Sequence, residues 1–262
     1  MLGAIAGDII GSVYEGSPIK TLDFPLFDRL CTFTDDTVLT AAVADALLQD
    51  EFAALDRHDL YVDALHDWFC RYPEAGYGGS FAFWADYRRR TPYGSWGNGA
   101  AMRVSPVAYA FPFLHEVVAE AKVSAEVTHD HEEGVKGAQA VAAAVFLAGD
   151  GATKAEIKAA VEQTFGYDLS EPLNCVRERY AFDVSSQGSV PQSIRAFLES
   201  ASFEEAVRLA ISLGGDADTM ACIAGSIAEP FYGGVPAEIE KETLARLDDP
   251  LRQIVQRFRK RF

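Results

Sequence analysis

Apolar residues recur at three- and four-residue intervals along most of this 262-residue chain, and this helical periodicity limits the folds open to it. Alanine is abundant, whereas the alternating β-branched residues typical of strands are scarce. The pattern therefore predicts an all-α protein. No low-complexity linker interrupts it, so we expect a single compact domain over residues 1–262. The predicted helices cover residues 37–48, 59–72, 131–149, 153–165, 190–200, 203–214 and 218–232.

Glycine and proline residues mark several of the expected helix boundaries. Pro191 suits the first turn of the helix over 190–200, because that position needs no N–H donor. Gly214 and Gly215 are expected to end the preceding helix just before an acidic motif.

Charge and composition exclude several functional classes. The formal net charge is −16, which argues against general affinity for nucleic acid or an anionic bilayer. No apolar run reaches the roughly 20 residues that a membrane-spanning helix needs. The start of the chain lacks the basic segment of a signal peptide, and the four cysteines form no CxxC pair. We expect a monomeric, cytoplasmic protein without a zinc ribbon or disulfide framework.

The N-terminal stretch LGAIAGDIIGSVYEG places glycines four residues apart, at Gly3, Gly7 and Gly11. Each costs roughly 1 kcal/mol of helix propensity against alanine. Glycines at this spacing are tolerable where they line one helix face that another helix approaches closely. We therefore expect a tightly packed core helix here.

Two short acidic motifs each precede an apolar run that predicts a helix: FTDDT at residues 33–37 and GGDADT at 214–219. Helix capping explains one acid or hydroxyl group in each motif. It does not explain the second, because surplus carboxylates beside buried surface must be desolvated or neutralised. If the two helix starts meet, four aspartates would balance two divalent cations, and oxygen ligands of this kind suit Mg²⁺, Mn²⁺ or Ca²⁺.

Two other metal-dependent enzyme classes fit the sequence less well. His-Asp pairs at 58–59 and 66–67, with the stretch THDH at 128–131, are compatible with an HD-type phosphohydrolase, but that class leaves both aspartate motifs unexplained. All-α isoprenoid synthases also use aspartate-rich motifs. Their first motif needs an acid at the fifth position, where this chain has Leu39.

Several further stretches complete a pattern that resembles the ADP-ribosylglycohydrolase family over nearly the whole chain. They occur in the family's order: GAIAGDIIGSVYE, FTDDT, GYGG, SWGNGAAMRVSP, THDH, SVPQSI and SLGGDADTMACIAGSIA. The resemblance implies an orthogonal all-α helical bundle with two Mg²⁺ or Mn²⁺ ions in a cleft. It also implies hydrolysis of the bond between ADP-ribose and an acceptor, so the expected partners are ADP-ribose and ADP-ribosylated substrates. Ala217 departs from the more usual Ser or Thr between the two aspartates, without changing the side chains expected to bind metal.

The resemblance assigns roles to the acidic motifs. It implies that Asp35, Asp36 or Glu15 takes the proton of the attacking water. Glu15 follows Tyr14 in a YE pair that assists catalysis in serine-directed members of the family. The expected metal ligands are Thr34, Asp35, Asp36, Asp216, Asp218 and Thr219.

The resemblance also implies a binding site for ADP-ribose. Glycine-rich residues would bring main-chain N–H groups to the diphosphate, and Trp96 would offer an aromatic face to adenine. His129 would line the distal ribose or phosphate pocket, whereas His131 is expected at a helix start or on the surface. Asn98 and Arg103 would contact the substrate or shape its loop. The substrate-binding set is Gly76, Tyr77, Gly78, Gly79, Gly94, Ser95, Trp96, Asn98, Arg103 and His129.

Two questions stay open at this stage. The acceptor is undecided among arginine, serine, a nucleic-acid base or end, and O-acetyl-ADP-ribose, because all present the same ribose. The alternative to an active hydrolase is a catalytically silent ADP-ribose-binding or structural relative, which would be expected to have lost metal ligands. This chain retains all six.

Overall fold

The computed structural model describes residues 1–49 and 57–262. Helices account for its regular structure, and the described residues include no strand beyond an isolated bridge between Gly97 and Ser185. The all-α prediction is therefore confirmed. The helices are α1 (Leu2–Glu15), α2 (Asp35–Gln49), α3 (Arg57–Arg71), α4 (Gly79–Asp86), α5 (Gly99–Arg103), α6 (Val107–Ala110), α7 (Leu114–Glu126), α8 (Glu132–Gly149), α9 (Lys154–Phe165), α10 (Leu173–Arg179), α11 (Ser186–Glu199), α12 (Phe203–Ile211), α13 (Ala217–Phe231), α14 (Ala237–Arg246) and α15 (Asp249–Arg261).

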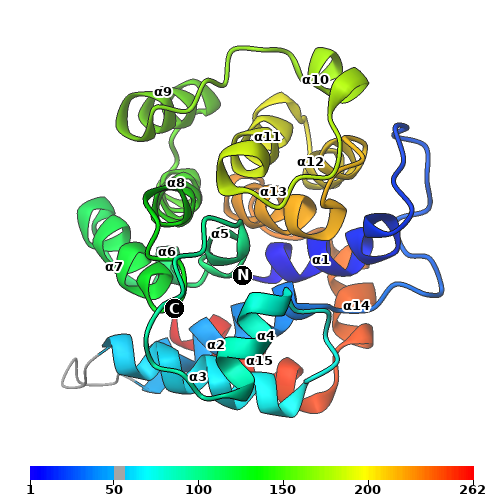
Figure 1. Cartoon of the computed structure of the whole chain (residues 1–262). Coiled ribbons are helices and arrows are strands. Elements are labelled where there is room, and N and C mark those ends of the chain that lie inside the picture. The colour runs from blue at the N-terminus through cyan, green and yellow to red at the C-terminus, as the bar shows by residue number, and fades with distance from the viewer. Residues whose placement is uncertain (50–56) are drawn as a thin grey trace.

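Helix α13 lies at the centre of the bundle and packs along α1 (Figure 1). Helices α8, α11 and α12 also contact α13, while α2 packs against α3 and α15. The buried apolar residues form one continuous cluster that runs through these helices. Within the described ranges, no helix combines the length and the apolar character needed to cross a membrane. The division of the chain into domains stays a prediction.

Two predicted boundaries are wrong. Helix α11 begins at Ser186, so Pro191 lies inside it rather than in its first turn. The reason is a cap that lies further upstream, because the Ser185 hydroxyl accepts a hydrogen bond from the N–H of Gly188. Helix α12 ends at Ile211, before the two glycines that were expected to end it.

Candidate active site

The glycine face of α1 brings that helix unusually close to α13. A Cβ atom on Gly7 would lie 2.1 Å from the carbonyl oxygen of Ala221, and one on Gly11 would lie 2.5 Å from the Cα of Asp218. The expectation that these glycines admit a neighbouring helix is confirmed. This approach places the acids of α1 beside the second acidic motif.

A first group of carboxylates joins α1, α2 and α13. Asp8, Asp36 and Asp218 each offer an oxygen that lies within 4.8 Å of one from each of the others. Asp8 is fully buried, and its carboxylate accepts hydrogen bonds from the N–H and hydroxyl groups of both Thr34 and Thr37. Asp8 was not among the site residues that the sequence predicted. The available signal was a single acid within an otherwise apolar, glycine-rich helix.

A second group shares Asp218 with the first. Glu15, at the last position of α1, lies with Asp216 and Asp218 so that one oxygen of each is within 4.8 Å of the others. The side-chain amide of Asn98 donates to Asp216 at 2.8 Å and to the Ser189 hydroxyl at 3.2 Å. Asn98 therefore orients a carboxylate of the second acidic motif, a role that the sequence did not predict, and its contact with the substrate stays a prediction.

Burial and mutual repulsion raise the pKa values of these acids. Burial is the main cause for Asp36 and Asp218, whose pKa values lie well above the ordinary range, and neighbouring aspartates add to it. The pKa of Asp35 rises to about 8, first through burial and then through Asp8 and Asp216. Burial, Asp216 and Asp8 likewise raise the pKa of Glu15. The site therefore favours bound protons or cations.

One carboxylate oxygen of this site has no partner of its own. Oδ1 of Asp36 is buried without a hydrogen bond among the described residues, whereas its Oδ2 accepts from the Thr219 hydroxyl at 3.0 Å. A buried carboxylate oxygen left without a donor is costly unless a cation binds it. The donor set, made only of carboxylate and hydroxyl oxygens, suits Mg²⁺ or Mn²⁺. The residues present thus fit a divalent metal site.

The chain before Asp216 is confined by two neighbouring loops. Gly214 has a φ angle of +60°, and a Cβ atom on it would lie 3.0 Å from both the carbonyl oxygen of Ile19 and Cε of Lys20. A Cβ atom on Gly215 would lie 2.4 Å from the ring of Tyr180. The two glycines of the motif are therefore needed for backbone conformation and close packing, which place Asp216.

All acids of the two carboxylate groups except the buried Asp8 line a cleft with a volume of about 320 Å³. All of the predicted metal ligands except Thr34 line it. The Thr34 hydroxyl donates a hydrogen bond to Asp8 at 2.7 Å. Of the predicted substrate-binding residues, seven line the cleft. They are Gly76, Gly78, Gly79, Ser95, Asn98, Arg103 and His129.

The glycine-rich loop meets the start of α2 at one wall of the cleft. The N–H of Asp35 donates to the carbonyl of Ala75 at 2.8 Å. Gly76 follows with a φ angle of +100°, and the nearest atom to a Cβ there would be Oδ1 of Asp35 at 3.8 Å. Asp35 belongs to neither group of three carboxylates and instead faces this loop.

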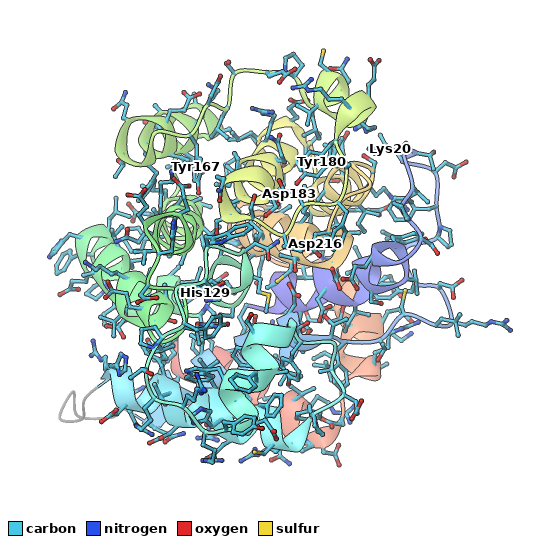
Figure 2. The ribbon with its side chains drawn as sticks, viewed as in Figure 1. Lys20, His129, Tyr167, Tyr180, Asp183 and Asp216 are labelled. Atoms are coloured by element: carbon cyan, nitrogen blue, oxygen red, sulfur yellow. The ribbon has the colours of Figure 1, made fainter. Side chains whose placement is uncertain are left out.

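A hydrogen-bonded chain fixes the imidazole of His129, which also lines the cleft. Arg103 is fully buried and donates to the Thr128 hydroxyl oxygen at 2.8 Å, and that hydroxyl lies 2.8 Å from Nδ1 of His129. Because Arg103 can only donate, the hydroxyl proton is free to go to Nδ1, which leaves the proton of a neutral imidazole on Nε2. Burial, and then Arg103, hold the pKa of His129 well below its ordinary value. Figure 2 shows His129 and Asp216 on separate segments of the chain, and both residues line the cleft.

Three predicted substrate-binding residues do not line the cleft. Tyr77 is half-buried and packs against the rings of Phe69 and Phe81 at the edge of the core. Gly94 has a φ angle of +70° and donates its N–H to Asp130 at 2.7 Å. The side chain of Trp96 is 50% exposed, next to the lining residues Ser95 and Gly97. His131 caps α8, as expected for a residue at a helix start.

Comparisons with known proteins match a family over the entire chain. The model of the ADP-ribosylglycohydrolase family matches residues 1–262. The ADP-ribosylhydrolase ARH3 of Mus musculus is 30% identical over an alignment that covers 89% of this chain and 82% of the relative. The ADP-ribosylarginine hydrolase Tri1 of Pseudomonas putida is 28% identical, with 92% of this chain and 72% of that protein covered.

A solved structure shares the fold. It is described as an ADP-ribosylglycohydrolase-related protein complex, and it superposes with a TM-score of 0.72 at 27% sequence identity. The superposition covers 99% of this chain and 96% of the other.

Proposed function

This chain belongs to the ADP-ribosylglycohydrolase family, and on that premise we propose that it is a dinuclear-metal-dependent hydrolase of ADP-ribose conjugates. The bond cleaved is the one between the anomeric carbon of the distal ribose and an acceptor. The observation that carries the proposal is the pair of carboxylate groups that share Asp218 at one cleft. A shared carboxylate between two groups is what a pair of neighbouring cations would need.

The metal part of the proposal names two Mg²⁺ or Mn²⁺ ions. Asp36, Asp216 and Asp218 would hold them, with Thr219, Glu15 and the newly identified Asp8 close by. Bound divalent ions would supply Lewis acidity and neutralise the clustered charge. Support comes from the unpartnered Oδ1 of Asp36 and from the raised pKa values of the acids.

The substrate would be bound by residues that line the cleft and by Trp96 beside it. Main-chain N–H groups of Gly76, Gly78 and Gly79 would bind the diphosphate, because a glycine-rich loop lets phosphate oxygens approach the backbone. The Nε2 proton of His129 would donate to a ribose or phosphate oxygen. Trp96 would stack on adenine at the rim, where half of its side chain is accessible.

In the hydrolysis step we assign the proton transfers to Glu15, with Asp35 as the second candidate base. Cleavage at an anomeric carbon passes through an oxocarbenium-like transition state and needs a carboxylate to move a proton. Glu15 lies at the cleft, and its raised pKa brings it closer to the range that serves proton transfer. Asp36 would serve as a metal ligand, since its carboxylate lies within the first group.

A substrate panel with defined metals tests the function. The metal-stripped protein is assayed with Mg²⁺, Mn²⁺ and no added ion against arginine-linked, serine-linked, nucleic-acid-linked and O-acetyl ADP-ribose, and released ADP-ribose is quantified. The proposal requires metal-dependent release from at least one conjugate, and loss of bound metal and release in Asp36→Asn and Asp218→Asn. Tight binding of ADP-ribose without turnover would instead establish the silent alternative. A monomeric, cytoplasmic enzyme stays a prediction of the sequence.

For Glu15, the expected result depends on the linkage. Glu15→Gln should lower hydrolysis of O-linked ADP-ribose at least about tenfold, roughly 1.4 kcal/mol of transition-state stabilisation, because an alkoxide leaving group needs a proton as the bond breaks. Metal content and unfolding midpoint should match the wild type. A variant that turns over every O-linked substrate at the wild-type rate would leave Asp35 as the candidate.

A further inference from the structure

The segment that follows Glu15 forms neither helix nor strand over residues 16–33. Its later part is attached to the bundle by Arg208, which donates to the carbonyls of Leu22 at 3.1 Å and Phe24 at 2.7 Å. The Tyr14 hydroxyl adds a bond to the carbonyl of Pro25 at 3.2 Å. These contacts tie residues 22–25 to the bundle and to Tyr14, and among the hydrogen bonds of the described residues none involves residues 16–19.

Lys20 supplies the first side-chain hydrogen bonds that tie this segment to other elements. Its ammonium donates to the main-chain carbonyls of Tyr180 and Leu213. Leu213 lies two residues beyond the end of α12, where helix carbonyls lack partners and the helix dipole favours a cation. Within the described ranges, Lys20 forms no ion pair with a carboxylate, so its interaction is with the main chain.

Both acceptors of Lys20 flank Asp216. Leu213 precedes Asp216 by three residues, and the ring of Tyr180 packs against Gly215. The aliphatic part of Lys20 lies against Gly214, where a Cβ atom would meet its Cε at 3.0 Å. In the view of Figure 2, Tyr180 lies above Asp216 and Lys20 lies further to the upper right. A single ammonium group thus connects the segment that follows α1 to the segment that presents the second acidic motif.

We propose that Lys20 is a positioning residue that fixes the segment after α1 and thereby adds to the packing of α1 on α13 in keeping Glu15 beside Asp216 and Asp218. Four residues separate Glu15 from Lys20, so fixing Lys20 against Leu213 restricts where Glu15 can lie relative to the acidic motif. This inference rests on the proposed function only for the role of Glu15 in hydrolysis. That Lys20 fixes the segment after α1 is a statement about the protein without metal or substrate.

The first experiment measures position without metal or turnover. Backbone ¹⁵N relaxation is recorded for Lys20→Met, which keeps an apolar stem and removes the donors, and for Lys20→Arg, which keeps the charge. In Lys20→Met the order parameters of residues 16, 17 and 19 should fall from about 0.85 to below about 0.6, while those of residues 22–33 stay unchanged. Lys20→Arg should resemble the wild type. Wild-type order parameters at residues 16–19 in Lys20→Met would overturn the proposal.

The second experiment is a double-mutant cycle with Glu15. If Lys20 acts through Glu15, then Lys20→Met and Glu15→Gln should each lower kcat about tenfold, and the double variant should also lose about tenfold rather than about a hundredfold. KM should change less than about twofold. Lys122→Met is the matched control, because Lys122 is an exposed lysine on α7 that lies 3.6 Å from Glu126 and should leave kcat unchanged.

The two experiments separate the two proposals. Additive losses in the cycle would show that Lys20 acts on something other than Glu15 and would overturn its assignment. A wild-type protein that releases no ADP-ribose from any conjugate would refute the proposed function, and the relaxation data would still decide whether Lys20 holds the segment.

Discussion

Replacing Asp8 by alanine tests the most consequential contact that the sequence did not predict. The carboxylate accepts hydrogen bonds from the main-chain N–H groups of Thr34 at 3.0 Å and Thr37 at 3.1 Å, and from the hydroxyls of both threonines. Alanine would leave the buried N–H of Thr37 and the partly buried N–H of Thr34 without acceptors, at about 1–3 kcal/mol each. The hydroxyls can rotate to other partners, and relief of repulsion on Asp36 and Asp218 offsets part of the loss. We expect a net destabilisation of about 2–5 kcal/mol.

Asp8→Asn is the matched variant, because it removes the charge and keeps the shape. Oδ2 of Asp8 accepts three of the four hydrogen bonds, so an amide oxygen at that place retains them, and the amide nitrogen would face the rotatable hydroxyl of Thr34. The metal-free protein should therefore keep its stability. The gain from metal should shrink, and a tenfold weaker Mn²⁺ affinity reduces the linked stabilisation by about 1.4 kcal/mol at a fixed excess of Mn²⁺.

Thermal unfolding followed by circular dichroism, in EDTA and in excess MnCl₂, separates these effects. For a chain of this length, the alanine variant should lose about 5–15 °C in Tm in EDTA. The asparagine variant should have the Tm of the wild type in EDTA and a lower Tm than the wild type in MnCl₂. A wild-type Tm for the alanine variant in EDTA would show that the four hydrogen bonds do not stabilise the start of α2. A wild-type Mn²⁺ gain for the asparagine variant would exclude Asp8 from the metal site.

Three further results are expected. Trp96→Ala should weaken ADP-ribose binding by about 1–3 kcal/mol in calorimetry with metal content intact, and unchanged affinity would remove Trp96 from the adenine site. The pKa of Asp35 is about 8 in the folded protein and about 3.9 when unfolded. Between about pH 3.9 and about pH 8, the folded state therefore binds a proton at Asp35 that the unfolded state has released. The Tm in EDTA should therefore fall as the pH rises through that window, and Mn²⁺ should reduce the fall; a pH-independent Tm in EDTA contradicts this. Gly7→Ala should lower Tm and weaken Mn²⁺ binding together, because its Cβ would lie 2.1 Å from the Ala221 carbonyl; an unchanged Tm would mean that α1 and α13 can separate freely.

Periodicity predicts helices only where a long amphipathic pattern exists. The expected helices over 37–48 and 218–232 agree with α2 and α13 to within two residues at each end. Helices α5 and α6 are too short, at five and four residues, to produce a detectable period. Helix α15 does carry a periodic signal in its sequence, since its buried residues Leu251, Ile254, Val255 and Phe258 follow helical spacing.

The acidic motifs were predictable as a pair because excess carboxylates before a helix have few explanations other than a cation. Residues that orient them were less accessible from sequence. Asn98 donates to Asp216 across 118 positions of the chain, and Thr219 donates to Asp36 across 183. Local pattern carries no information on such pairings. The same holds for the hydrogen-bonded chain from Arg103 through Thr128, because it depends on how α5 packs beside the loop before α8.

Acids begin both α2 and α13 although other groups cap α2 or hold the acids of α13, so these acids are left to bind a cation. At α2, Asp8 on another helix provides the cap, because it accepts a hydrogen bond from the N–H of Thr37. Asp36 is therefore not needed as the cap, and its Oδ1 has no hydrogen-bond partner among the described residues. At α13, Asp216 occupies the N-cap position but its side chain accepts no capping bond, and Asn98 holds it toward the cleft instead. Both helix N-termini still place their positive dipole ends beside the carboxylates, which reduces the cost of burying them before any metal binds. The fold can thus assemble its acids without a cation and leave the remaining charge for a ligand to neutralise.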